Sequence, residues 1–209
     1  GYYGLSILDG ESRQSLFAAG LNNIIELKEA DLNGDGKREI IAADGDGKVT
    51  VFGYDGSSFQ QLWQSISFYG INAMDIANCD NDPALEIIFS RNNGIIQAFD
   101  GQTKLLQWQI QATGNSIAQL AVDDLDGDGE IELLYTAGNS LYFFNGQTQQ
   151  LLANFYDITQ TDILALEIAN LDSSSRKEIL IVDQKLKIID SESFLITWES
   201  PIVNSNYWD

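Results

Sequence analysis

The chain has 209 residues, 44% of them hydrophobic, and a formal net charge of −20, which gives enough apolar material for one or two well-packed domains. Because phosphate binding needs clustered lysine and arginine, this acidic balance argues against a nucleic-acid partner and an anionic membrane surface. There is no histidine and one cysteine, Cys79, which excludes a Ser-His-Asp or Cys-His catalytic centre, a histidine-dependent zinc site and an internal disulfide.

The sequence also gives no sign of insertion into a membrane. Its apolar runs are shorter than the ~20 residues that a membrane-spanning helix needs. The first residues, Gly1-Tyr2-Tyr3-Gly4, lack the basic start of a signal peptide, so we expect a mature form, a fragment or a cytosolic protein.

An acidic nine-residue segment recurs along the chain at a nearly constant spacing. Its first copy, residues 31–39, reads Asp-Leu-Asn-Gly-Asp-Gly-Lys-Arg-Glu, and the other copies begin at Asn78, Asp124 and Asn170, so the starts are 46 or 47 residues apart. We name residues 31–39, 78–86, 124–132 and 170–178 acidic loops 1 to 4. A period in the forties indicates a repeated supersecondary unit.

Each repeat is predicted to contain four short strands. An apolar strand precedes each acidic loop, over residues 24–30, 71–77, 117–123 and 163–169. A second strand starts at the last residue of the loop and runs as a continuous apolar segment, which is typical of a strand buried on both faces. The third strand spans residues 49–52, 95–99, 141–144 and 186–189, and the fourth follows the next turn.

The turn between the third and fourth strands carries its own repeated signal. Its first two residues are Asp9-Gly10, Asp55-Gly56, Asp100-Gly101, Asn145-Gly146 and Asp190-Ser191. Asp-Gly between two apolar runs predicts a type I′ hairpin, whose central residues need positive φ. Eight residues after each Asp or Asn stand Phe17, Trp63, Trp108, Ala153 and Trp198, and we expect these bulky side chains to pack in the core.

Four hairpin-linked strands per repeat predict an all-β fold, specifically a β-propeller of four-stranded blades. We assign a single propeller domain or propeller segment over residues 1–209, with a partial N-terminal blade (1–21) and four complete blades (22–66, 69–111, 115–158 and 161–200). The alternative is a stacked β-solenoid, whose coils usually repeat at shorter periods. The ring is either a small one of about five blades or part of a larger propeller.

The acidic loops present oxygen atoms on alternate residues, with glycines that allow a tight path, and this pattern suits calcium. Loops 1 and 3 are the strongest matches, with backbone carbonyls expected from Lys37 and Glu130. Loop 2 keeps the oxygens but has Pro83 in place of a glycine, so we expect weaker binding there. Loop 4 has no glycine and brings Arg176 and Lys177 close, so we expect it to be empty. The predicted Ca²⁺ ligands are Asp31, Asn33, Asp35, Lys37, Glu39, Asn78, Asp80, Asp82, Ala84, Glu86, Asp124, Asp126, Asp128, Glu130 and Glu132.

These loops and their flanking strands resemble FG-GAP repeats, as found in the propeller of integrin α-subunits and in many bacterial surface proteins. The resemblance implies calcium bound between the first and second strands of a blade, and a role in adhesion or scaffolding. The Phe-Gly and Gly-Ala-Pro words of that family are not clearly present, and the period is shorter than in integrin blades. The segment 96–108 is also similar to the repeats of quinoprotein propellers, many of which are non-enzymatic scaffolds.

The leading functional hypothesis is a calcium-stabilised module for protein interaction or adhesion, at the cell surface, outside the cell or in the periplasm. A second is carbohydrate recognition, as a lectin or as part of a polysaccharide lyase, in which Trp63, Trp108 and Trp198 would stack on sugars. A quinoprotein-like scaffold is a further alternative. Nothing in the sequence selects a catalytic set, so we expect no enzyme activity; the protein or carbohydrate ligand is left open.

Overall fold

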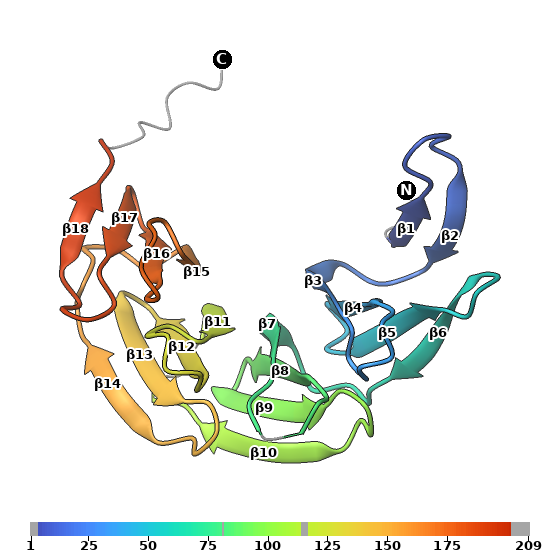
Figure 1. Cartoon of the computed structure of the whole chain (residues 1–209), viewed down its shortest axis with the longest axis horizontal. Coiled ribbons are helices and arrows are strands. Elements are labelled where there is room, and N and C mark those ends of the chain that lie inside the picture. The colour runs from blue at the N-terminus through green and yellow to red at the C-terminus, as the bar shows by residue number, and fades with distance from the viewer. Residues whose placement is uncertain (1–3, 81, 114–116, 202–209) are drawn as a thin grey trace. The chain divides into compact units, whose positions relative to one another are not determined.

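The computed structural model describes residues 4–80, 82–113 and 117–201, and these residues form strands and turns without a helix. No helix in this part of the chain is therefore long and apolar enough to cross a membrane. The strands form antiparallel sheets within two compact units, residues 1–111 and residues 112–209 (Figure 1). Each unit is described by itself.

The first unit contains one two-stranded and two four-stranded sheets. The two-stranded sheet pairs β1 (Leu5–Leu8) with β2 (Ser15–Ala19). The next sheet has the order β3 (Ile24–Ala30), β4 (Glu39–Asp44), β5 (Val49–Tyr54) and β6 (Phe59–Gln64). The third has the order β7 (Ile71–Ala77), β8 (Glu86–Arg91), β9 (Ile95–Asp100) and β10 (Leu106–Gln111).

The second unit contains two four-stranded sheets with the same order. One consists of β11 (Gln119–Asp123), β12 (Glu132–Ala137), β13 (Ser140–Asn145) and β14 (Leu151–Phe155). The other consists of β15 (Ala165–Ala169), β16 (Glu178–Val182), β17 (Leu186–Ile189) and β18 (Ile196–Glu199). Every strand pairs with its neighbour in sequence, as a meander of hairpins requires. The all-β class and the four-stranded repeats are confirmed, whereas the arrangement of the sheets as a propeller stays a prediction.

The hydrophobic core lies between consecutive sheets of each unit. In the first unit, Ile41 and Val51 face Met74 and Phe89 of the next sheet in one buried cluster. In the second unit, Leu134 and Phe143 lie with Ile168 and Ile181 in an equivalent cluster. The two central strands of most sheets are buried on both faces, which explains their continuous apolar sequences.

Two first strands are shorter than predicted. β11 and β15 begin at Gln119 and Ala165, two residues after the predicted starts. At the matching point of β3 and β7 the pairing register shifts. In the second unit the ladder is interrupted there, and single hydrogen bonds from Ala118 N to Thr136 O (3.0 Å) and Leu164 N to Val182 O (2.7 Å) remain.

The predicted type I′ geometry, which needs positive φ at two central residues, is absent from all five turns. Only Gly56 has positive φ (100°); in the other four turns the positive φ falls on Arg13, Lys104, Gln149 and Phe194, four residues after the Asp or Asn. The Asp or Asn Oδ1 instead accepts hydrogen bonds from the backbone N–H and hydroxyl of a Ser or Thr three residues later, at Ser12, Thr103, Thr148 and Ser193. These are side-chain-capped turns, and their signal in the sequence is Asp/Asn-x-x-Ser/Thr.

The repeated bulky residues of the fourth strands are only partly in the core. Phe17 and Trp63 pack against the clusters of the first unit, and Ala153 packs against that of the second. Trp198 is 49% exposed, because every residue of β18 lies at the surface. The expectation of core packing is therefore wrong for Trp198.

Candidate functional site

The structure places all four acidic loops at the same point of their sheets, between the first and second strands. The last residue of each loop is a glutamate that opens the second strand. Its Oε2 accepts a hydrogen bond from the backbone N–H of the second loop residue: Leu32 (3.0 Å), Cys79 (2.5 Å), Leu125 (2.9 Å) and Leu171 (2.8 Å). One glutamate oxygen thus closes the loop, and the other remains available.

Loop 3 brings three carboxylates together. One oxygen each of Asp124, Asp126 and Glu132 lies within 4.8 Å of the others. Asp124 accepts hydrogen bonds from the N–H groups of Gly127 (2.8 Å) and Gly129 (3.1 Å), and both glycines have positive φ. The predicted role of these glycines is therefore correct: the path they allow turns the backbone donors toward the first aspartate.

Loop 2 brings together Asp80, Asp82 and Glu86 by the same criterion, despite Pro83. In loops 1 and 3 the residue at the position of Pro83 is a glycine whose N–H donates to the first aspartate. Proline has no N–H to donate, and the first residue is correspondingly the neutral Asn78, whose Nδ2 donates to the carbonyl of Asp82 (2.8 Å). The bond from Asn78 thus replaces the one lost at Pro83, and loop 2 still brings its carboxylates together.

Glu86 is the most constrained group of the site. Its side chain is fully buried (0% exposed), and Oε1 has no hydrogen-bond partner within the described residues. A buried, unpaired carboxylate oxygen is costly unless a proton or a cation satisfies it. A cation or an added proton would satisfy this oxygen and also offset the charges of Asp80 and Asp82 beside it.

Burial near other carboxylates also changes the pKa values of Glu86 and of its equivalent in loop 3, Glu132. Burial, followed by the charges of the neighbouring aspartates, raises the pKa of Glu86 and of Glu132 to about 7, against an ordinary value of 4.5. Clustered carboxylates in a partly dry site favour either protonation or a bound cation. Oxygen-only ligands of this kind suit a hard divalent cation, Ca²⁺ or Mg²⁺ among them.

Loop 1, which with loop 3 is one of the two strongest matches in sequence, does not form such a triad of carboxylates among the described residues. Asn33 stands where loop 3 has Asp126, and Asp31, Asn33 and Asp35 each accept hydrogen bonds from loop N–H groups. Burial also raises the pKa of Glu39, and the charge of Lys104 opposes that rise. The hydrogen bond from Leu32 N–H also lowers this pKa, and Lys104 places a positive charge near Glu39.

Loop 4 has the closing glutamate, Glu178, but no triad in the described structure. Asn170 Nδ2 donates to Ser174 O (2.8 Å), and Ser174 N donates to Asp172 Oδ1 (2.6 Å). Lys177 pairs with Asp123 (2.5 Å) of the preceding sheet, and Arg176 lies 3.9 Å from Glu192. This loop is held by its own hydrogen bonds and ion pairs.

The described side chains bring together six of the predicted ligands, and the roles of the others stay predictions, including the carbonyls of Lys37, Ala84 and Glu130. One residue near the site was not foreseen: Gln107 on β10 donates its side-chain N–H to Asp80 Oδ2 (2.8 Å). It stands 27 residues from Asp80, and a glutamine on a polar strand face carries no signal for this contact.

Two cavities open beside the loops. One of about 460 Å³ lies between loop 1, strand β6 and the turn that joins β9 to β10. It is lined by Asn33, Asp35, Glu39, Leu62, Trp63, Gly101, Gln102 and Lys104. The other, of about 230 Å³, includes Asp126 and Glu132 of loop 3 with Phe143 and Phe194. A cation in either loop would lie at the wall of a cavity.

No family model matches this chain, and no curated protein matches it.

Proposed function

We propose that this chain is a calcium-stabilised β-propeller module that presents an interaction or adhesion surface, outside the cell or in the periplasm. The observation that carries the proposal is the buried Oε1 of Glu86, which has no hydrogen-bond partner among the described residues, within the triad of Asp80, Asp82 and Glu86. A second triad at the same place in another repeat supports a common role.

Calcium is the ion we favour because the predicted ligands of the loops are all oxygen atoms. Ca²⁺ accepts six to eight oxygens at about 2.3–2.6 Å, whereas Mg²⁺ requires a tighter octahedral arrangement. We expect affinities of about 0.1–1 mM, as in extracellular calcium modules. Sites of this affinity would be occupied in a compartment with millimolar calcium.

The ion is proposed to stabilise the sheet rather than to carry chemistry. Binding would neutralise the clustered carboxylates and fix the connection between the first and second strands, so that metal binding adds directly to folding stability. The meandering four-stranded repeats and the absence of histidine support a scaffold that is not an enzyme. The resemblance to FG-GAP repeats supports adhesion.

Calorimetric calcium titration and thermal melting test this proposal directly. We expect calcium to raise the Tm of the wild-type protein, and the double variant E86Q/E132Q to lose most of that rise. The matched control is E178Q, which alters the equivalent glutamate of loop 4. No heat of calcium binding, together with equal Tm values in calcium and in EDTA, would overturn the proposal.

Carbohydrate recognition remains the second candidate, because Trp63 lines the cavity beside loop 1 and Trp198 is half exposed. Quenching of tryptophan fluorescence by a soluble quencher, with and without added oligosaccharide, tests it. Protection of Trp63 by the sugar, lost in Trp63→Leu, supports this function. Unchanged quenching contradicts it.

A further inference from the structure

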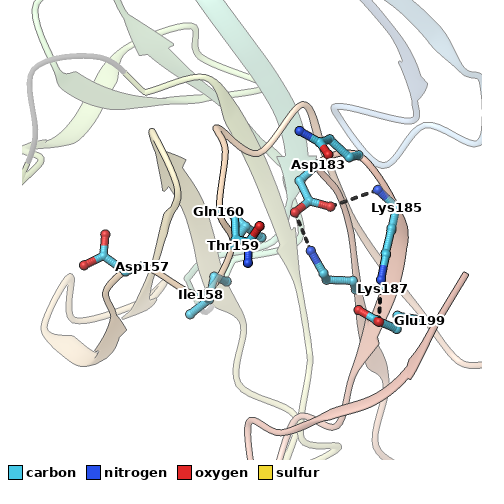
Figure 2. A pocket seen from close by; sticks show the side chains of 9 residues that line it. Asp157, Ile158, Thr159, Gln160, Asp183, Lys185, Lys187 and Glu199 are labelled. Carbon is cyan, nitrogen blue, oxygen red and sulfur yellow. Dashed lines mark hydrogen bonds and ion pairs between the residues drawn. The ribbon is translucent and has the colours of Figure 1, made fainter. Parts of the chain in front are cut away.

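A polar cavity of about 380 Å³ lies in the second unit, away from the acidic loops. It is lined by Asp157, Ile158, Thr159, Gln160, Asp183, Gln184, Lys185, Lys187 and Glu199. Figure 2 shows the charged residues of the last sheet on one side, with the segment 157–160 facing them. Its size lies at the lower end of small-molecule sites, about 300–1,000 Å³.

Three of the lining side chains are buried and held in place. Thr159, Asp183 and Lys187 are each less than a tenth exposed. Thr159 Oγ1 donates to Thr161 O (2.6 Å), and Lys187 Nζ donates to Asp183 Oδ2. Lys185 contributes its backbone N–H to Asp183 Oδ1 (2.9 Å) and its ammonium to Glu199 (2.6 Å). The wall is therefore a preorganised set of donors and acceptors.

Lys187 is unusual when the repeats are compared. Strand pairing places Thr50, Gln97, Tyr142 and Lys187 at the same position of the third strand. In the first unit the equivalent residue bonds to a neutral partner on the fourth strand: Gln64 donates to Thr50 (3.0 Å), and Gln97 donates to Gln109 (3.2 Å). In the last sheet these two positions hold Lys187 and Glu199, which bond to Asp183 and Lys185 instead of to each other.

This replacement is not explained by stability. Buried ion pairs are often no better for stability than neutral or apolar residues of the same shape, and the two four-stranded sheets of the first unit have a neutral pair at this position. Although burial would raise the pKa of Asp183, hydrogen bonds from Lys187 and Lys185 outweigh it and lower that pKa, so the Asp183 carboxyl is ionised. Lys187 Nζ has one oxygen partner within the described part of the chain, which leaves ammonium protons for a ligand.

The charges of the wall select the class of ligand. An anion would face Asp157, Asp183 and Glu199, and a cation would face Lys185 and Lys187. A neutral molecule with several hydroxyl groups can donate to the carboxylates and accept from the ammonium groups at once. Ile158 alone is apolar among the lining residues, so an apolar ligand would remove water from these charged groups without forming hydrogen bonds to them.

We propose that the cavity between residues 157–160 and the last sheet is a binding site for a neutral polyhydroxyl ligand, with a sugar unit as the fitting chemistry. Lys187 and Asp183 form its floor, and Lys185, Glu199 and Thr159 surround the ligand. The site is distinct from the acidic loops and does not require the proposed calcium.

Ligand-observed NMR with glucose, galactose, mannose, N-acetylglucosamine, myo-inositol and glycerol tests the proposal. We expect at least one sugar or inositol to bind in the millimolar range and glycerol to bind much more weakly. In the double variant K187Q/E199Q, which recreates the Gln97–Gln109 pair, affinity should fall about tenfold or more, the loss expected for hydrogen bonds to charged groups. Glu11→Gln, a surface change in the first unit, should leave binding unchanged.

Two outcomes would overturn the inference: no probe binds, or the K187Q/E199Q variant binds each probe as well as the wild type does. Equal binding of glycerol and the sugars would mean that the cavity binds hydroxyl compounds without selectivity, and this would also overturn the inference. The Tm and its calcium response, measured on the same samples, show that the variant is folded. They also separate failure of this site from failure of the proposed calcium function.

Discussion

At the scale of single residues, Glu86 is a carboxylate whose burial opposes its negative charge. One of its oxygens accepts the N–H of Cys79, and the other is buried without a partner among the described residues. An unpaired buried charge costs more than a missing hydrogen bond between neutral groups. Metal-free protein therefore either protonates this carboxyl or carries a standing penalty at neutral pH.

The variant E86Q should consequently stabilise the metal-free protein. The side-chain amide oxygen that the substitution introduces can still accept the hydrogen bond from Cys79 N–H, and the negative charge is removed. A gain of about 1 kcal/mol corresponds to a rise of roughly 2–4 °C in Tm for a chain of this size. Thermal melting in EDTA at pH 8 measures it. E178Q, where no triad is present among the described side chains, should leave the Tm within about 1 °C, and a lower Tm for E86Q than for E178Q would contradict this account.

The pKa values of Glu86 and Glu132 also predict a pH dependence for the metal-free protein. Below the ordinary pKa of 4.5 both carboxyls are protonated in the folded and unfolded states. As the pH rises toward about 7, the unfolded chain releases these protons while the folded protein retains them, so the free energy of unfolding falls. Above that pH the loss is complete.

Urea unfolding in EDTA between pH 5 and pH 8 measures this fall, and the E86Q/E132Q variant should show less of it. Calcium needs the ionised carboxylates, so its stabilising effect should grow over the same interval. Metal-free stability that rises with pH across this window would be inconsistent with the raised pKa values.

At the scale of elements, the turns between the third and fourth strands show how one sequence motif can serve a different physical purpose from the expected one. The Asp or Asn side chain caps the turn through a Ser or Thr. Gly101 is required by space: a Cβ atom there would lie 2.2 Å from Leu85 O and 2.9 Å from Leu32 O. Gly10, in the equivalent turn of the two-stranded sheet, has no neighbour within 4 Å of such an atom.

The two glycines therefore make a matched pair. Gly101→Ala should lower the free energy of unfolding by about 1–3 kcal/mol, the usual cost of overpacking, because loops 1 and 2 meet the turn at that point. Gly10→Ala should be neutral or slightly stabilising, since its φ is not positive. Chemical denaturation of both variants checks this. Equal destabilisation by the two substitutions would instead support the type I′ geometry that the structure replaces.

Much of the secondary structure follows directly from the repeated sequence. Strand positions and the loop–strand junctions were predictable, because the repeats average out local ambiguity and the strands are continuous apolar runs. The hydrogen bonds and charges around each loop were not. Loop 1 places the charge of Lys104 near Glu39, and loop 2 compensates for Pro83 through a hydrogen bond from Asn78. Such compensation depends on hydrogen-bond geometry and on residues from other strands.

At the scale of the whole molecule, the dominant property is the net charge of −20. A charge this far from zero keeps a protein soluble but destabilises the folded state through self-repulsion. Neutralising the two triads with divalent ions would remove charge where it is most concentrated. Salt and calcium should therefore act on overlapping parts of the same repulsion.

Ionic strength should accordingly change the stability of the metal-free protein more than that of the calcium-loaded protein. Raising NaCl from low concentration to about 0.1–0.15 M shortens the screening length to roughly 8–10 Å, which weakens repulsion among surface carboxylates but reaches the buried Glu86 poorly. We expect the Tm in EDTA to rise with NaCl, and the additional rise on adding calcium to shrink without vanishing. Melting curves over a grid of NaCl and CaCl₂ concentrations measure both effects. If added NaCl abolished the calcium effect completely, calcium would be acting as a general screening ion, and the buried triads would not be its sites.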